Sequence, residues 1–180
     1  LALAAPQVFV VTDGAGQPVR AAALSVFVRG APAAAPPGTL AVMGQRNKSF
    51  DPSILVIQTG TQVSFPNFDT VRHHVYSFSP IKVIDIKLYS GTPAEPIVFD
   101  KPGVAALGCN IHDRMSAHVV VVDTPLFART DERGRATLDL PPGEHVVKAW
   151  HAGQKSPTTL QSLKLDVPAA GGTLALTLTD

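Results

Sequence analysis

The sequence predicts an all-β protein. Sixteen Pro and fourteen Gly are scattered through segments rich in Val, Leu, Thr and Phe, and no long stretch shows a helical repeat of apolar positions. The 180 residues are enough for one large domain or two small ones, each able to bury a core. Neither a metal nor a disulfide is therefore needed simply to hold the fold.

The first segment has the pattern of a strand, a turn and a second strand. Between Gln7 and Arg29, two arms rich in Val and Phe flank the turn-forming residues Asp13 to Pro18. A stretch of Pro and Ala follows from Gly30 to Gly38. Such a stretch is typical of a linker, and it marks the best domain boundary in the first half of the chain.

The middle of the chain predicts a series of short strands, one of which leads directly into the only cysteine, Cys109. Side chains alternate between the two faces of a strand, so the adjacent His73 and His74 cannot both face one site. The expected strands are Ile54 to Phe65, broken at Thr59 to Thr61, then Val71 to Phe78, Ile97 to Phe99, Val104 to Leu107 and His118 to Val122.

The last third predicts four more strands, with a turn at Pro141 to Gly143. The segment Thr130 to Trp150 resembles the latter half of a carboxypeptidase-regulatory or transthyretin-like β-sandwich, and Val11 to Val28 resembles its first half. The expected strands are Ala136 to Leu140, His145 to Trp150, Leu163 to Val167 and Leu174 to Leu178.

This resemblance implies a discontinuous second small sandwich, formed by residues 7–30 and 125–180, into which a domain of residues 35–123 is inserted. The alternative is that Gln7 to Val28 supplies the opening strands of the middle domain itself.

Charge and hydropathy exclude several classes of partner. The net charge is +1 and the basic residues are dispersed, which argues against nucleic acid or an anionic membrane surface. The longest apolar runs, such as Val119 to Val122, are far shorter than the ~20 residues that a membrane span needs. The opening residues Leu1 to Pro6 look like the end of a signal peptide, which predicts export. An exported chain with one cysteine would expose a reactive thiol unless Cys109 binds a metal or a second molecule.

The segment from Cys109 to Met115 has the ligand types of a copper site. Its spacing, Cys109-x-x-His112-x-x-Met115, supplies a thiolate, an imidazole and a thioether on one short loop. Two imidazoles, a thiolate and a weak axial thioether suit both Cu(I) and Cu(II). The second imidazole must come from another strand, and His73 is favoured over His74 by its spacing from Asn67.

These residues resemble the cupredoxin family, and the loop spacing is that of its amicyanin-like members. Gly60 to Phe65 resembles the family's strand before the first His ligand, Phe99 to Cys109 its strand into the Cys, and Met115 to Val121 its exit strand. The phrases Phe65 to Asn67 and Cys109 to Asp113 also occur in a group of methylamine-utilisation or plastocyanin-like periplasmic proteins.

The resemblance covers about half of the chain. It implies a Greek-key β-sandwich with one type 1 (blue) copper ion held by His73, Cys109, His112 and Met115. It further implies a periplasmic protein that functions in electron transport, with redox partners such as a c-type cytochrome or a dehydrogenase.

Two positions depart from the family pattern. Cupredoxins usually have Asn directly after the first His ligand, where its side chain ties the two ligand loops together, but this chain has His74. An imidazole hydrogen bond would have to replace that tie. The residues after His112 are Asp113 and Arg114, where cupredoxins usually have apolar residues, so partner docking is expected to be more electrostatic.

Copper storage or delivery and catalysis are the alternatives to electron transfer. Copper storage or delivery would need an exchangeable site, richer in Met and His and more open. An enzyme is not expected, because no second His cluster is visible and Cys109, flanked by Gly108 and Asn110, has no orienting third group for nucleophilic catalysis. Met43 could approach copper as a second sulfur donor, but a core or surface role is expected for it. His118 is expected to be a surface or inter-domain residue, His145 and His151 structural residues, and Trp150 a core or interface aromatic.

Overall fold

The computed structural model describes residues 3–93, 95–111 and 114–179, and within these ranges the chain forms seventeen strands and no helix. The predicted all-β class is therefore confirmed. No helix in the described part of the chain could cross a membrane. The chain divides into two compact units, one made of Leu1–Pro32 with Thr124–Asp180 and one made of Ala33–Asp123. We refer to them as the terminal unit and the central unit.

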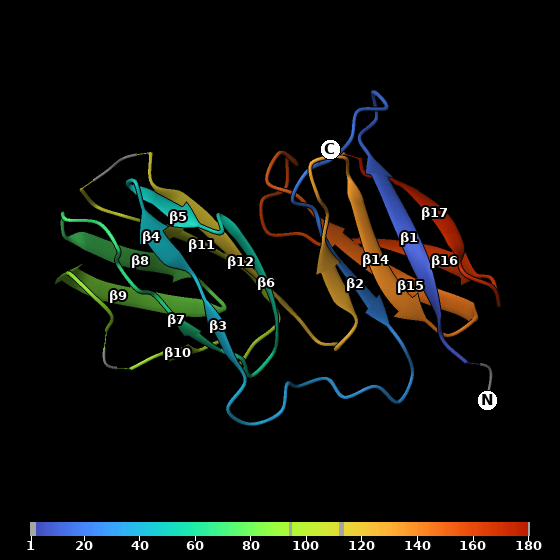
Figure 1. The fold of residues 1–180 in the computed structure, drawn as a ribbon, viewed down its shortest axis with the longest axis horizontal. Helices are drawn as coiled ribbons and strands as arrows, with labels where there is room; N and C mark the ends of the chain where they lie inside the picture. Colours follow the sequence, from blue (N-terminus) through green and yellow to red (C-terminus); the bar gives the residue numbers. More distant parts are fainter. Residues whose placement is uncertain (1–2, 94, 112–113, 180) are drawn as a thin grey trace. The chain divides into compact units, whose positions relative to one another are not determined.

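The terminal unit consists of one mixed sheet and one antiparallel sheet, and the two share one core. One sheet has the order β14-β1-β17 and the other β13-β2-β15-β16 (Figure 1). The strands are β1 (Ala5–Thr12), β2 (Ala23–Phe27), β13 (Phe127–Arg129), β14 (Arg135–Leu140), β15 (Gly143–Trp150), β16 (Gln161–Val167) and β17 (Gly172–Thr177).

Alternating apolar side chains of both sheets fill this core. Phe9 and Val11 from β1 are fully buried together with Leu24 and Val26 from β2. The strands β1 and β2 pair only with strands of the last third of the chain, namely β14 and β17 for β1, and β13 and β15 for β2. These two strands therefore belong to the terminal unit and do not open the central one.

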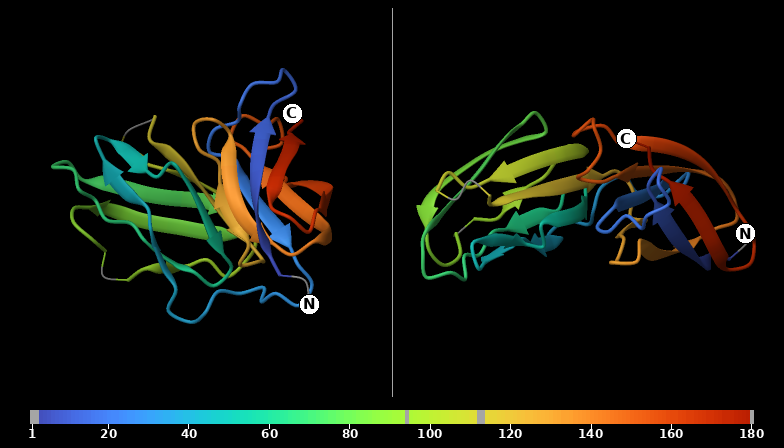
Figure 2. Two further views of the ribbon diagram at one scale, coloured as in Figure 1. Left: turned by 45° about the vertical axis from the view of Figure 1, so that its right-hand side comes forward. Right: turned by 90° about the horizontal axis from the view of Figure 1, so that it is seen from above.

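The central unit has a sheet of five strands in the order β6-β12-β11-β8-β9, a sheet of three in the order β10-β7-β3, and the hairpin β4-β5. Figure 2, right, shows its two layers edge-on. The strands are β3 (Leu40–Val42), β4 (Gly44–Arg46), β5 (Ser49–Asp51), β6 (Ile54–Gln58), β7 (Gln62–Ser64), β8 (His73–Ser79), β9 (Lys82–Tyr89), β10 (Ile97–Val98), β11 (Gly103–Gly108) and β12 (Ser116–Val122).

The core of the central unit extends to its sulfur-bearing residues. Val63 and Phe65 pack in one cluster with Leu107, Cys109 and Met115, all at most 3 % exposed. Alternation along β8 points His73 and Val75 into this cluster. Burial of apolar side chains on both layers, worth about 25 cal/mol per Å², thus fixes the two strands that lead to the candidate ligands.

Two sequence-based expectations need refinement. The turn at Asp13 to Pro18 is present, with the amides of Ala15 and Gln17 donating to Asp13 Oδ1, but β1 and β2 lie in different sheets. The segment Ile54 to Phe65 forms two strands as expected, which also join different sheets. The turn at Thr59 to Thr61 carries the chain from one sheet to the other, whereas the turn at Asp13 to Pro18 first returns the chain along β1, where the amide of Val19 donates to the carbonyl of Val11.

Candidate metal centre

His73 and Cys109 come together because their strands are neighbours in the five-stranded sheet. β8 begins at His73, β11 ends at Gly108, and the two strands pair antiparallel, with Gly108 opposite Tyr76. Cys109 is thus the first residue beyond its strand. Its Sγ lies 3.9 Å from His73 Nδ1, and both residues are buried. An imidazole nitrogen and a thiol thus face one another in the interior.

Met115 lies in the same buried cluster, one residue before β12 begins. Met43 belongs to this cluster too and is fully buried. His112 and Asp113 lie outside the described residues, so the predicted ligand role of His112 stays a prediction. Within the described ranges no three His, Cys, Asp or Glu side chains form a metal-binding group. Three of the four predicted ligands lie in the described ranges: the imidazole of His73, the thiol of Cys109 and the thioether of Met115.

Asp69 connects His73 to the turn of the β4-β5 hairpin. Its Oδ2 lies 2.8 Å from His73 Nε2 and accepts a hydrogen bond from the amide of Lys48, while its Oδ1 accepts one from the amide of Asn47. Asn47 and Lys48 have φ values of 53° and 54°, which suit the two central positions of a tight hairpin turn. Asp69 thus ties together a hairpin, a loop and the first residue of β8.

The same contacts keep Asp69 ionised. Burial by itself would raise the pKa of Asp69, but the hydrogen bonds from His73 and from the amides of Lys48 and Asn47 outweigh it, so the pKa lies below its usual value of 3.8. A carboxylate can only accept hydrogen bonds, so in this contact His73 Nε2 is the donor. Nδ1 lies on the side of the ring that faces Cys109.

His74 faces the opposite way, as the alternation along the strand predicted. Its Nε2 lies 2.5 Å from Asp85 Oδ1 on β9, and its Nδ1 lies 3.1 Å from the side-chain nitrogen of Asn110. Asn110 directly follows Cys109. Hydrogen bonds from Asp85 through His74 to Asn110 therefore link the edge strand β9 to the loop that begins at Cys109.

Tyr76 covers the backbone on the other side of Cys109. A β-carbon placed on Gly108 would lie 2.6 Å from the Tyr76 ring, so only glycine leaves room for this contact. The ring of Tyr76 also lies near Phe78, with centroids 5.3 Å apart. Two side chains of the outer face of β8 therefore contact the neighbours of Cys109: Tyr76 contacts Gly108, and His74 contacts Asn110.

Three polar side chains, of which Gln45 and Asn67 are buried and Tyr89 is half-buried, support the loop from Phe65 to His73. Tyr89 donates to the carbonyl of Phe65, and Gln45 Nε2 lies 2.6 Å from the Tyr89 hydroxyl. Burial raises the pKa of Tyr89 to about 12, although the hydrogen bond with Gln45 acts to lower it. Asn67 donates to the carbonyls of Val71 and Tyr89. The loop that carries Asp69 is thereby fixed at both ends.

The chemistry of the donors fits copper. An unprotonated imidazole nitrogen, a thiol and a thioether are the donors that copper accepts in both of its common oxidation states. Thioether and thiolate donors are unsuited to Mg²⁺ or Ca²⁺, which take oxygen ligands. The donor types of His73, Cys109 and Met115, all buried, therefore suit a soft metal better than a hard cation.

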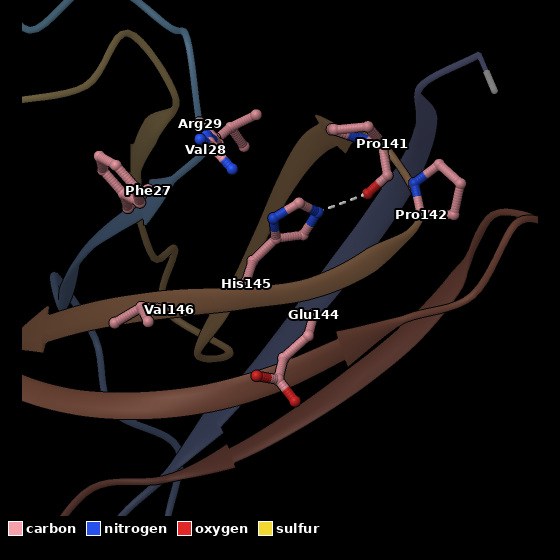
Figure 3. Close-up of a pocket in the computed structure, with 8 residues that line it drawn as sticks. All are labelled: Phe27, Val28, Arg29, Pro141, Pro142, Glu144, His145 and Val146. Carbon is pink, nitrogen blue, oxygen red and sulfur yellow. Dashed lines mark hydrogen bonds between the residues drawn. The ribbon is translucent and has the colours of Figure 1, made fainter. Parts of the chain in front are cut away.

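Two further histidines, His118 and His145, lie on β12 and β15. Burial lowers the pKa of His118, which lies on β12 opposite Ala106. His145 Nε2 lies 2.7 Å from the carbonyl oxygen of Pro141, in the wall of a pocket of about 290 Å³ in the terminal unit (Figure 3). The side chains around it are Phe27, Val28, Arg29, Pro141, Pro142, Glu144 and Val146.

Sequence reasoning missed the residues that position the ligands, above all Asp69, Asp85 and Tyr76. The spacing of Asp69, four residues before His73, was a usable signal for a carboxylate–imidazole pair. Asp85 was missed because the strand that carries it, β9, was not predicted.

Comparison with known proteins gives similarity only at the level of solved structures. No family model matches the chain, and no curated protein matches it. The reduced form of an amicyanin mutant is 17% identical with a TM-score of 0.42, and the match covers 54% of this chain and 97% of that one. Native pseudoazurin from Hyphomicrobium denitrificans is 21% identical with a TM-score of 0.41, covering 46% of this chain and 75% of that one. The carboxypeptidase-regulatory resemblance of the chain ends is not confirmed by these comparisons.

Proposed function

We propose that the central unit is a cupredoxin-like type 1 copper domain and that the protein carries single electrons between redox partners. Its metal ligands are His73, Cys109, His112 and Met115. The observation that carries the proposal is the close approach of His73 Nδ1 to Cys109 Sγ, 3.9 Å apart in a buried cluster that also contains Met115. When bound, copper supplies a one-electron couple that needs no proton.

The residues of the chain have separate tasks in this function. Cys109 would provide a thiolate and His73 an imidazole as strong donors to copper, and Met115 would provide a weaker thioether donor. The apolar cluster around them excludes water. Because copper(I) and copper(II) prefer different geometries, a set of donors that moves little between the two states favours fast electron transfer.

Rigidity supports an electron carrier over a copper-delivery protein. His73 is held through Asp69, and the segment on either side of Cys109 is held by Tyr76 and by His74 with Asn110. Supporting hydrogen bonds of this kind orient metal ligands and raise metal affinity. A protein that hands copper on would gain from ligands that can open.

Cellular context follows from the same proposal. A buried thiolate bound to copper is protected from oxidation, which suits a periplasmic protein. The partners are redox proteins, such as a c-type cytochrome or a dehydrogenase, that dock close to His112. The protein itself turns over no substrate.

Voltammetry of the copper-loaded protein tests this function. A carrier gives a reversible one-electron wave, and the copper stays bound through repeated cycles. Cys109→Ser, which preserves size and removes the thiolate, should abolish the wave. Loss of copper on each reduction or oxidation, or binding of Cu(I) alone, would instead make the protein a copper-delivery protein.

A further inference from the structure

The carboxylate of Asp69 contacts the imidazole of His73, the proposed copper ligand, at the ring nitrogen that does not face Cys109. Asp69 Oδ2 lies 2.8 Å from His73 Nε2, the side chain of His73 is fully buried, and that of Asp69 is 13% exposed. Nothing in the ligand spacing of the sequence requires an acidic residue there. The pair places one negative charge next to the site, on the far side of the ring from Cys109.

This carboxylate is fixed in place by more than the histidine. Both of its oxygens accept backbone hydrogen bonds, from Asn47 at 2.7 Å and from Lys48 at 2.8 Å. Its own amide donates to Asn67 Oδ1 at 2.9 Å. The charge therefore cannot swing away from His73 without breaking its hydrogen bonds to two amides of a tight turn.

We infer that Asp69 is a positioning residue that fixes the Nε2–H tautomer of His73 and lowers the reduction potential of the copper site. This inference rests on the proposed function. In that tautomer the Nδ1 lone pair points toward Cys109 Sγ, 3.9 Å away. Hydrogen bonding to a carboxylate also makes the ring a stronger electron donor.

The sign of the effect on the potential follows from charge. Oxidation adds one positive charge at the metal, and a fixed negative charge nearby favours the more positive state. The low dielectric of the buried cluster strengthens that preference. Asp69 therefore raises the affinity for Cu(II) more than that for Cu(I).

The adjacent histidine offers a matched control. His74 also pairs its Nε2 with a carboxylate, Asp85, but its ring faces away from Cys109 and its Nδ1 is engaged by Asn110. The substitutions Asp69→Asn and Asp85→Asn remove the same charge from two His–carboxylate pairs of the same sheet. Only the first pair is directed at the proposed site.

The experiment compares the reduction potentials of the copper-loaded wild type, Asp69→Asn and Asp85→Asn. In Asp69→Asn the ratio of Cu(II) to Cu(I) affinity should fall about tenfold, which is a rise of about 59 mV for a one-electron couple. In Asp85→Asn the rise should be much smaller. A potential that changes equally in both variants, or not at all in Asp69→Asn, overturns the inference.

A second measurement needs no variant and no metal. Nitrogen NMR of the wild-type apoprotein reports which ring nitrogen of His73 carries the proton, and the inference requires Nε2. A proton on Nδ1 overturns the inference even if the protein proves to bind copper. If the wild type gives no blue copper site, the proposed function fails, whereas the tautomer still decides whether Asp69 positions His73.

Discussion

Two adjacent histidines have opposite roles in this chain because a strand turns successive side chains to opposite faces. His73 points into the core toward Cys109, and His74 points outward to Asp85 and Asn110. Each ring is bonded at Nε2 to a carboxylate, so each presents Nδ1 to a residue at the start of the same loop. The loop is thereby held from both faces of β8.

The link between His74 and Asn110 predicts an energetic coupling. In apoprotein unfolded by urea and followed by NMR signals of β8, His74→Ala and Asn110→Ala should each destabilise the central unit. The loss of unfolding free energy in the double variant should be about 1 kcal/mol smaller than the sum of the two single losses, because the shared hydrogen bond is lost only once. Strictly additive effects would show that the bond contributes nothing.

Candidate ligands could be proposed from the sequence, but the residues that support them could not. The spacing of Cys109, His112 and Met115 is local. Alternation lets only one of His73 and His74 face the site, and the spacing from Asn67 favours His73. Asp69 and Asp85 act through hydrogen bonds that depend on the path of a loop and on a neighbouring strand. Such contacts have no period in the sequence by which they could be recognised.

Among the elements, the contact between β8 and β11 is unusually close. The Tyr76 ring occupies the space where a side chain on Gly108 would begin. Gly108→Ala should therefore destabilise the central unit by about 1–3 kcal/mol, as overpacking of a buried contact does. Thermal unfolding measures the loss.

Removal of the ring gives the matching control. In Tyr76→Ala the space above Gly108 is open, so adding Gly108→Ala to that variant should cost much less than it does in the wild type. If Gly108→Ala destabilised the wild type and Tyr76→Ala equally, the loss of stability would come from the backbone of Gly108 and not from the Tyr76 contact.

The turn between β13 and β14 predicts a pH dependence. The amides of Arg135 and Arg133 donate to Asp131 and lower its pKa below 3.8. A lowered carboxyl pKa stabilises the fold at pH values above 3.8, and this contribution is lost as the pH falls through the folded-state pKa. Thermal unfolding followed by Trp150 fluorescence should show it.

Asp131→Ala is the test of that assignment. Its melting temperature should lie below that of the wild type near neutral pH, and the two should converge as the pH falls well below 3.8. A constant difference across this pH range would mean that the ionisation of Asp131 contributes no stability.

The strands that sequence analysis missed share a physical reason. β3, β4, β5 and β13 are three residues long, too short to show alternation. β9 is long but lies at a sheet edge, where Val83 and Leu88 are exposed and blur the apolar pattern. β8, which has one clean buried face, and β12, which has a run of four buried valines, were predictable.

At the level of the whole chain, each unit has a core of its own. Trp150 lies in the terminal unit, whereas both tyrosines, Tyr76 and Tyr89, lie in the central one. The division into units comes from strand pairing between distant segments. Composition alone left open whether Gln7 to Val28 belongs to the middle domain.

Copper removal should therefore affect the two units differently. With free copper a hundredfold above its dissociation constant, binding adds about 2.7 kcal/mol of stability to the unit that holds it. For a unit of this size that raises the melting temperature by roughly 10 °C or more. Calorimetry should show this shift in the central unit, while the transition reported by Trp150 stays where it is in the apoprotein. A shift of both transitions would contradict separate units.

Addition of Cu(II) to the apoprotein, followed by visible absorption, tests the central claim most directly. A thiolate bound to Cu(II) in a site of this kind gives an intense visible charge-transfer band that oxygen- and nitrogen-ligated copper lacks. We expect the band at one copper per chain in the wild type and in His74→Ala, and its absence in Cys109→Ser and His73→Ala. A wild-type protein that stays colourless, or a band that persists without Cys109, would contradict the account.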